Sequence, residues 1–184
     1  MFHMRIITGK SKGRKLKGSR IKGTRPTSQK VKESLFNIIG ERICGATFLD
    51  LYAGTGAIGI EALSRGAGGV VFVENGFQSR KIIEENLSLT GLGERAEVFG
   101  MKAERFVETT NEKFDIVFAD PPYRTGEVNI ILEKLSRCDI INQEGLLIVE
   151  HFKKKYLPGN IGEMKRLKEY RYGDTYLSVY KKGE

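Results

Sequence analysis

The fold is decided by the stretch TFLDLYAGTGAIG, residues 47–59. Its first part, Thr47 to Tyr52, is a short apolar run of the kind that forms a buried strand, and a helical segment from Ile60 to Arg65 follows. Gly54 and Gly56 stand between the two and allow a tight turn whose backbone can lie against a ligand. A Gly-x-Gly pair alone is weak evidence, but this order of strand, glycine turn and helix predicts the ligand crevice of an α/β sheet.

Outward from this stretch, strands and helices alternate along the chain. We predict strands at residues 47–52, 69–73, 95–99, 114–119 and 145–150, helices at 27–40, 60–65, 76–90, 103–109 and 126–137, and a closing hairpin of strands 164–171 and 175–181. The alternation predicts an α/β fold with a doubly wound, Rossmann-like sheet that has one antiparallel member. Short apolar arms at 5–8 and 15–16 predict an additional β-hairpin at the N-terminus.

Two acids at strand ends favour S-adenosylmethionine over a dinucleotide as the cofactor. Glu74 follows the strand 69–73 and can accept from both hydroxyls of a ribose. Asp50 would repel a pyrophosphate but attract the sulfonium and ammonium groups of S-adenosylmethionine. A nicotinamide oxidoreductase is the alternative, which Asp50 disfavours. The predicted cofactor-binding residues are Asp50, Tyr52, Ala53, Gly54, Thr55, Gly56, Glu74, Asn75, Ala103 and Asp120.

A second motif, Asp120-Pro121-Pro122-Tyr123, follows the apolar strand 114–119 and therefore lies at the same edge of the sheet. The Asp120 carboxylate and the Pro121 carbonyl can each accept one N–H of an exocyclic amine, and Tyr123 offers a face for base stacking. An isolated Asp-Pro-Pro is equally typical of a turn that merely ends a strand. Beside the glycine turn, the motif favours a base-binding site, with Asp120, Pro121, Pro122 and Tyr123 as catalytic residues.

Positive charge is concentrated at the N-terminus. Residues 1–42 hold twelve Lys or Arg and two acids, whereas residues 43–184 hold nineteen and twenty-one. We therefore divide the domain into a basic extension, residues 1–42, that faces RNA and a methyltransferase part, residues 43–184. A solvated tail is the alternative, but the hairpin arms favour an ordered surface that follows a phosphate backbone. The candidate RNA-binding residues are Arg5, Lys12, Arg14, Lys15 and Arg25.

Size and composition exclude several other classes. A chain of 184 residues that is 40% hydrophobic fits one domain with a substantial core. We expect a cytoplasmic protein with no membrane partner, because no apolar stretch approaches the length of a membrane span. Cys44 and Cys138 lack metal-ligand spacing, so we expect no bound metal. The oligomeric state is not encoded in any motif, and we expect a monomer.

The chain resembles the RsmD-like methyltransferases along nearly its whole length, from about Met4 to Lys182. The resemblance rests on several motifs. They are Arg5-Ile6-Ile7-Thr8-Gly9, Gly13-Arg14-Lys15-Leu16, Arg25-Pro26-Thr27, Val31-Lys32-Glu33-Ser34-Leu35-Phe36-Asn37, Asp50-Leu51-Tyr52-Ala53-Gly54-Thr55-Gly56, Glu61-Ala62-Leu63-Ser64-Arg65-Gly66-Ala67 and Asp120-Pro121-Pro122-Tyr123. The chain departs from the family at Lys102, where relatives often have Asp or Asn before an alanine to contact the adenine amine, and at Asn75, where an acid is frequent.

The resemblance implies transfer of a methyl group from S-adenosylmethionine to the N2 amine of a guanine in bacterial 16S rRNA. The implied partner is this rRNA, the small ribosomal subunit or an assembly intermediate of it. One alternative is an amino methyltransferase that acts on adenine N6 or cytosine N4 of DNA or another RNA. Another is a nonenzymatic RNA-binding module, against which the intact Asp50, Glu74 and Asp120 argue.

Overall fold

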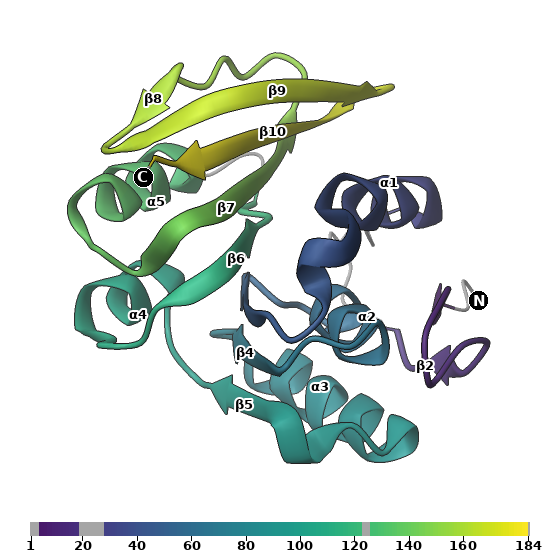
Figure 1. The fold of residues 1–184 in the computed structure, drawn as a ribbon. Coiled ribbons are helices and arrows are strands. Elements are labelled where there is room, and N and C mark those ends of the chain that lie inside the picture. The colour runs from purple at the N-terminus through teal and green to yellow at the C-terminus, as the bar shows by residue number, and fades with distance from the viewer. Residues whose placement is uncertain (1–3, 19–27, 123–125, 184) are drawn as a thin grey trace.

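One mixed sheet organises the computed structural model, which describes residues 4–18, 28–122 and 126–183. In these residues the sheet has eight strands in the order β5-β4-β3-β6-β7-β10-β9-β8 (Figure 1). The strands are β3 (Thr47–Leu51), β4 (Gly69–Val73), β5 (Ala96–Phe99), β6 (Phe114–Ala119), β7 (Ile141–Phe152), β8 (Asn160–Ile161), β9 (Met164–Tyr172) and β10 (Thr175–Lys182). The first five are parallel, so their carboxyl ends share one edge.

Helices cover both faces of the sheet, and each face has its own apolar core (Figure 1). The helices are α1 (Gln29–Ile39), α2 (Ala57–Ser64), α3 (Phe77–Thr90), α4 (Ala103–Thr109) and α5 (Glu127–Arg137), with short 3₁₀ helices at Gly40–Ile43 and Gly93–Arg95. Successive side chains of β3 point to opposite faces of the sheet. Phe48 packs into the core with α1, α2 and α3, whereas Leu49 packs into the core with α4 and α5. Central strands buried on both faces account for the continuous apolar runs of the sequence.

The predicted doubly wound sheet is confirmed, and so is the antiparallel strand, since β10 runs opposite to β7. Two details differ from the prediction. The strand β8, two residues antiparallel to β9, was not predicted. The predicted start of β7 was Gly145, whereas the strand begins at Ile141. The early part pairs with β6 across a register shift, and Glu144 has a positive φ of 62°. This irregular backbone hides the first residues of β7 from a period-2 pattern.

The N-terminal hairpin consists of β1 (Met4–Arg5) and β2 (Lys15–Leu16). It is shorter than predicted because the backbone N–H groups of Ile7 and Thr8 donate to a side chain of α2 instead of to the opposite strand. That side chain is Glu61, whose carboxylate is fully buried.

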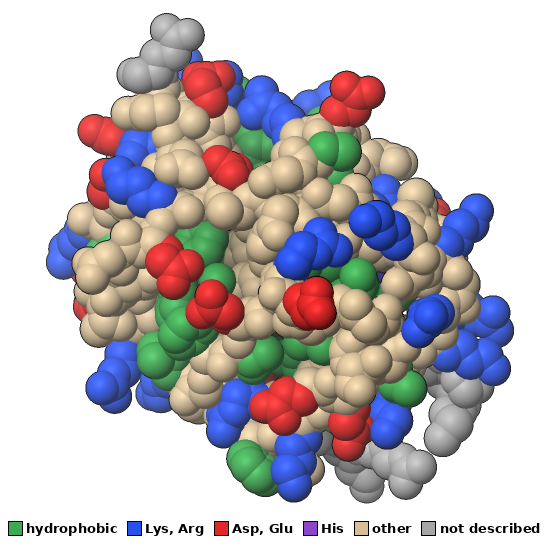
Figure 2. All heavy atoms as spheres, turned by 60° about the horizontal axis from the view of Figure 1, so that its bottom comes forward, with side chains coloured by type: hydrophobic (Ala, Val, Ile, Leu, Met, Phe, Trp, Pro, Cys, Tyr) green, Lys and Arg blue, Asp and Glu red, His purple; other side chains and the backbone are tan. Residues whose placement is uncertain are grey.

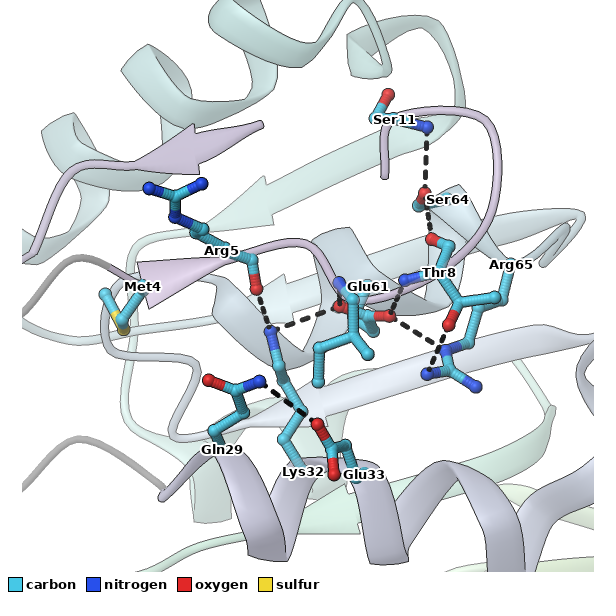
Figure 3. Close-up of polar contacts among 12 residues, drawn as sticks. Met4, Arg5, Thr8, Ser11, Gln29, Lys32, Glu33, Glu61, Ser64 and Arg65 are labelled. Carbon is cyan, nitrogen blue, oxygen red and sulfur yellow. Dashed lines mark hydrogen bonds and ion pairs between the residues drawn. The ribbon is translucent and has the colours of Figure 1, made fainter. Parts of the chain in front are cut away.

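Buried Glu61 joins three parts of the molecule (Figure 3). Its Oε2 accepts from Ile7 N at 2.8 Å and pairs with Lys32 Nζ of α1 at 3.1 Å. Its Oε1 accepts from Thr8 N at 3.0 Å and from Arg65 Nε at 2.9 Å. Burial lowers the pKa of Lys32, while the carboxylate of Glu61 acts in the opposite direction. The charge of Glu61 is therefore compensated on every side, and the hairpin is fixed against α1 and α2.

Ser64, one turn further along α2, holds the next part of the hairpin (Figure 3). Its hydroxyl donates to the Thr8 carbonyl at 2.7 Å and accepts from Ser11 N at 3.1 Å. Gly9 has a φ of +88°, and a Cβ there would lie 1.8 Å from the Ser64 carbonyl oxygen. Only glycine permits this close approach of the hairpin to α2.

Replacing Glu61 should destabilise the fold strongly. Glu61→Ala leaves two backbone N–H groups without their acceptor. It also removes the carboxylate partner of the buried Lys32 ammonium, which keeps the Arg5 carbonyl as an acceptor at 2.7 Å. Loss of one partner of a buried ion pair typically costs about 3–5 kcal/mol. Urea denaturation of the variant should show this loss in the free energy of unfolding. The exposed Glu84→Ala on α3 is the control and should change it by less than about 0.5 kcal/mol. Equal stability of the two variants would contradict the anchoring role.

Candidate active site

A cavity of about 690 Å³ opens at the edge where β3, β4, β6 and β7 end. Cavities of roughly 300–1,000 Å³ are typical of small-molecule and cofactor sites. The lining includes most of the residues predicted for cofactor and catalysis: Tyr52, Gly54, Glu74, Asn75, Ala103, Asp120, Pro121 and Pro122. Four of the predicted cofactor residues, Asp50, Ala53, Thr55 and Gly56, do not line it. Tyr123 lies outside the described residues.

The glycine turn forms one wall of the cavity. Tyr52, Gly54 and Gly56 have φ angles of 64°, 57° and 75°, so the chain reverses tightly between β3 and α2. Gly54 N donates to Glu74 Oε2 at 2.8 Å and Gly76 N donates to Glu74 Oε1 at 2.6 Å. Each carboxylate oxygen keeps a further lone pair, so Glu74 can still accept hydroxyls of a ribose.

Tyr52 adds a polar group that lacks a partner within the described residues. Its hydroxyl is buried at the cavity wall and makes no hydrogen bond there. Burial, followed by the charges of Glu104 and Glu127, raises the pKa of Tyr52, so the hydroxyl keeps its proton. Buried polar groups in proteins are almost always hydrogen-bonded. The orphaned hydroxyl, the accepting Glu74 and the cavity volume together fit a polar, cofactor-sized ligand.

Asp50 lies beneath the glycine turn. It is 2% exposed, and its Oδ2 accepts from Gly59 N in the first turn of α2 at 2.9 Å. Burial raises the pKa of Asp50 to about 7; the Gly59 hydrogen bond lowers it and the charge of Glu74 raises it further. Asp50 therefore acts on the cavity through its charge and through the position of the turn.

Asp120 and Glu150 complete an acidic edge with Asp50 and Glu74. Asp120 and Glu150 both line the cavity, at the ends of β6 and β7. Burial, then the charge of Glu150 and that of Asp50, raises the pKa of Asp120 well above its ordinary value. Four acids so close together favour a ligand that carries positive charge. Within the described residues, no group of three or more His, Cys, Asp or Glu side chains could hold a metal ion.

Several lining residues were missed by the sequence analysis. Glu150 could have been predicted from the sequence. It is the last residue of the predicted strand 145–150, and Asp120 directly follows the predicted strand 114–119, so both acids are expected at the same edge of the sheet. Others come from elements that tertiary folding brings to the edge: Ser28, which caps α1, Val31 of α1, Met101 before α4, and Tyr172 and Thr175 of the last hairpin. Lys102, expected to disturb an adenine contact, precedes α4 and also lines the cavity.

The predicted RNA-binding residues lie on the N-terminal hairpin, away from the cavity lining. The side chains of Arg5, Lys12, Arg14 and Lys15 are exposed, and Arg14 donates to the Leu89 carbonyl at the end of α3. Arg25 lies outside the described residues. Figure 2 shows Lys and Arg side chains along the right-hand side of the molecule, where the hairpin lies in Figure 1.

Asn86 of α3 links this hairpin to the glycine turn. The side chain is fully buried. Its Oδ1 accepts from Lys17 N at 2.7 Å, and its Nδ2 donates to the carbonyls of Lys17 and Thr55 at 3.1 and 3.0 Å. One amide therefore holds the end of β2 and the glycine turn together.

The strand order and the antiparallel β10 define the fold of class I S-adenosylmethionine-dependent methyltransferases. Within the described residues, no helix is long and apolar enough to cross a membrane. Residues 4–181 match the family described as Conserved hypothetical protein 95, and the chain belongs to this family of RsmD-like and YlbH-like proteins.

Three relatives illustrate the similarity. "Putative rRNA methyltransferase YlbH" of Bacillus subtilis is 37% identical over 97% of this chain and 99% of its own length. Ribosomal RNA small subunit methyltransferase D of Escherichia coli K12 is 36% identical over 84% of this chain and 78% of its own length. The solved structure titled "Putative methyltransferase yhhF from Escherichia coli" is 31% identical and has a TM-score of 0.88, covering 99% of each chain.

Asp50 should make the stability of the ligand-free protein depend on pH. Its pKa is about 7 in the folded state against an ordinary 3.8, so between these values the folded state holds a proton that the unfolded state has lost. The resulting stabilisation is complete below the lower value and is lost as the pH rises through the higher one.

The free energy of unfolding of the wild type should decrease as the pH rises across this range. The side chain of Asn cannot ionise, so Asp50→Asn should make this decrease smaller. Urea denaturation at a series of pH values measures the slope. The exposed Glu84→Gln should leave the wild-type slope in place. A wild-type slope in Asp50→Asn would show that Asp50 is ionised throughout.

Proposed function

We propose that this protein transfers a methyl group from S-adenosylmethionine to the N2 amine of a guanine in the 16S rRNA of the small ribosomal subunit. One observation carries the proposal: a single cavity is lined by both Glu74 and the Asp120-Pro121-Pro122 turn. Glu74 can accept hydrogen bonds from the hydroxyls of a ribose, and the Asp120-Pro121-Pro122 turn can accept them from an exocyclic amine. Similarity to Ribosomal RNA small subunit methyltransferase D supports rRNA as the substrate.

The acidic edge suits the cofactor. When bound, S-adenosylmethionine supplies an electrophilic methyl group on a sulfonium, and it also carries an ammonium group. Glu74, Asp120 and Glu150 line the cavity and Asp50 lies beneath its glycine turn, and negative charge on these acids is favourable for both cations. The proposed contacts are Glu74 to the ribose hydroxyls and the glycine turn to the amino-acid part. Met101 and Ala103 offer an apolar wall to the adenine.

Asp120 and Pro121 would orient the target amine. The lone pair of a guanine N2 is delocalised into the ring, so the amine is a poor nucleophile. If the Asp120 carboxylate accepts one N–H and the Pro121 carbonyl the other, the nitrogen is drawn toward tetrahedral geometry and its lone pair points away from both acceptors. Positioning of this kind, together with charge that offsets the cationic amine of the transition state, is the main catalytic effect.

The same carboxylate is suited to take up the surplus proton. Burial and the neighbouring charges of Glu150 and Asp50 raise the pKa of Asp120, and a raised pKa makes its carboxylate a stronger base. When the neutral amine receives the methyl group, its nitrogen becomes cationic and its N–H groups become acidic. One of these protons would pass to the Asp120 carboxylate and then to water. Catalysis should accordingly improve as the pH rises and Asp120 ionises.

Asp120→Asn is the sharpest test of this mechanism. The amide can accept a hydrogen bond but has no charge and no basicity, so methyl transfer should fall about a hundredfold or more while cofactor binding persists. Single-turnover assays with labelled cofactor and small ribosomal subunits measure the rate, and calorimetry with S-adenosylhomocysteine measures binding.

Mass spectrometry of nucleosides from the same assays identifies the product. N2-methylguanosine is expected, and its absence with wild-type protein on both free rRNA and subunits would overturn the proposed function. Methylated adenosine or cytidine would instead support the alternative targets. A methyl-transfer rate close to that of the wild type in Asp120→Asn would show that the Asp120 carboxylate has no catalytic role and that the residue only shapes the turn.

The N-terminal hairpin should provide phosphate contacts. Lys12 and Lys15 are exposed and lie beside the anchored backbone of the hairpin. Replacing both by Ala should weaken RNA binding and lower the slope of log K against log salt by about two, roughly one for each lost phosphate contact. The matched control replaces Arg105 and Arg137, exposed on α4 and α5. Equal slopes in the two double variants would make the hairpin a solvated extension only.

A further inference from the structure

A second basic segment lies near the C-terminus, inside the otherwise acidic methyltransferase part. Residues 153–174 contain seven Lys or Arg and three acids, a net charge of +4, whereas residues 43–152 contain ten and seventeen, a net charge of −7. The segment begins with Lys153-Lys154-Lys155-Tyr156, which we name the 153–156 loop.

The 153–156 loop begins at the cavity. It follows β7, whose last residue, Phe152, lies opposite Thr175 of β10, and Thr175 lines the cavity. Lys153 N donates to the Asp174 carbonyl at 2.9 Å, and Lys153 Nζ pairs with the Asp174 carboxylate at 2.7 Å. Asp174 stands in the turn between Tyr172 and Thr175, both lining residues. Lys153, the first residue of the loop, is therefore bound to the β9–β10 turn, whose flanking residues Tyr172 and Thr175 line the cavity.

Hydrogen bonds hold the backbone on either side of Tyr156, while Lys154 and Tyr156 are exposed to solvent and Lys155 is half-exposed. Lys155 N donates to the Phe152 carbonyl at 2.9 Å and closes a tight turn. Beyond the loop, the Tyr180 hydroxyl donates to the Pro158 carbonyl at 2.8 Å. Between these anchors the Tyr156 side chain is 94% exposed. A single exposed aromatic is ordinary on a protein surface, but this one follows three lysines in a loop whose first residue contacts the β9–β10 turn.

This surface lies across the cavity from the N-terminal hairpin. The lining of the cavity includes the start of α1, with its capping residue Ser28 and Val31, and the β9–β10 hairpin, with Tyr172 and Thr175. Figure 1 shows α1 between the hairpin of β1 and β2 on one side and the turn of β9 and β10 on the other. A strand of RNA whose base entered the cavity would extend from it in two directions, so two separate basic surfaces could each hold one part of the strand.

We propose that the 153–156 loop is a second RNA-contacting surface, which binds the strand on the side of the target nucleotide opposite to the N-terminal hairpin. This inference rests on the proposed function. Lys154 and Lys155 would contact phosphates, and the Tyr156 ring would stack on an unpaired base. Tyr172, which lines the cavity, would offer a second aromatic face to the target base.

Two variants separate the two contacts. Lys154→Ala with Lys155→Ala should weaken binding of an rRNA stem-loop that contains the modified guanine about tenfold and lower its salt slope by about two. Tyr156→Ala should weaken binding about tenfold with an unchanged salt slope, whereas Tyr156→Phe, which keeps the ring, should stay within about twofold of wild type. Lys153 is left in place because it holds the β9–β10 turn.

The kinetic readout distinguishes binding from chemistry. In the lysine pair and in Tyr156→Ala, the KM for RNA should rise while kcat at saturating RNA and the affinity for S-adenosylhomocysteine remain at wild-type values. Arg105→Ala with Arg137→Ala is the control of matched charge. If the lysine pair shows the RNA affinity and salt slope of this control, or if Tyr156→Ala equals Tyr156→Phe, the inference is overturned.

Failure of this inference differs from failure of the proposed function. If wild-type protein neither binds nor methylates rRNA, the proposed function fails, and with it the second surface. If wild-type protein methylates the guanine and all loop variants match their controls, only the second surface fails.

Discussion

The buried carboxylate of Glu61 is the constraint on which the relation between the hairpin and the methyltransferase sheet depends. It has no exposure to solvent, so its charge must be met by protein groups, and α1, α2 and the segment after β1 each supply at least one. Such a set of contacts tolerates little displacement, because moving any one element would leave a charge without a partner in the core. The basic hairpin is therefore an ordered surface rather than a tethered tail.

The helix that carries Glu61 also carries the start of the cofactor turn. α2 has eight residues. Near its beginning, Gly59 N donates a hydrogen bond to Asp50. Further along the helix, the side chains of Glu61 and Ser64 form hydrogen bonds with the hairpin. Asn86 makes a second link from Lys17 to Thr55. The proposed RNA grip and the proposed cofactor site thus share one short, rigid element, and their relative position is fixed by the fold before any ligand binds.

The sequence was sufficient for those parts of the fold and site that depend on local pattern. The glycine turn after β3 and the Asp120-Pro121-Pro122 turn after β6 both follow apolar runs, so their place at the carboxyl edge could be deduced. Tyr172 and Thr175 could not be assigned in this way, because they reach the cavity only when β10 inserts beside β7. Glu61 was equally hidden, since a glutamate within a short helix ordinarily faces solvent.

Charge is arranged in opposite senses inside and outside the cavity, and this arrangement suits the proposed reaction. The interior is acidic, with the pKa values of Asp50 and Asp120 raised by burial and by their acidic neighbours. A cationic cofactor relieves this repulsion, whereas a phosphate would increase it. The two surfaces proposed to contact RNA, residues 4–18 and 153–156, are basic. A polyanionic strand would therefore be attracted to these surfaces and repelled by the acidic interior. A neutral base is the part of such a strand that can enter, which requires that the nucleotide be unstacked.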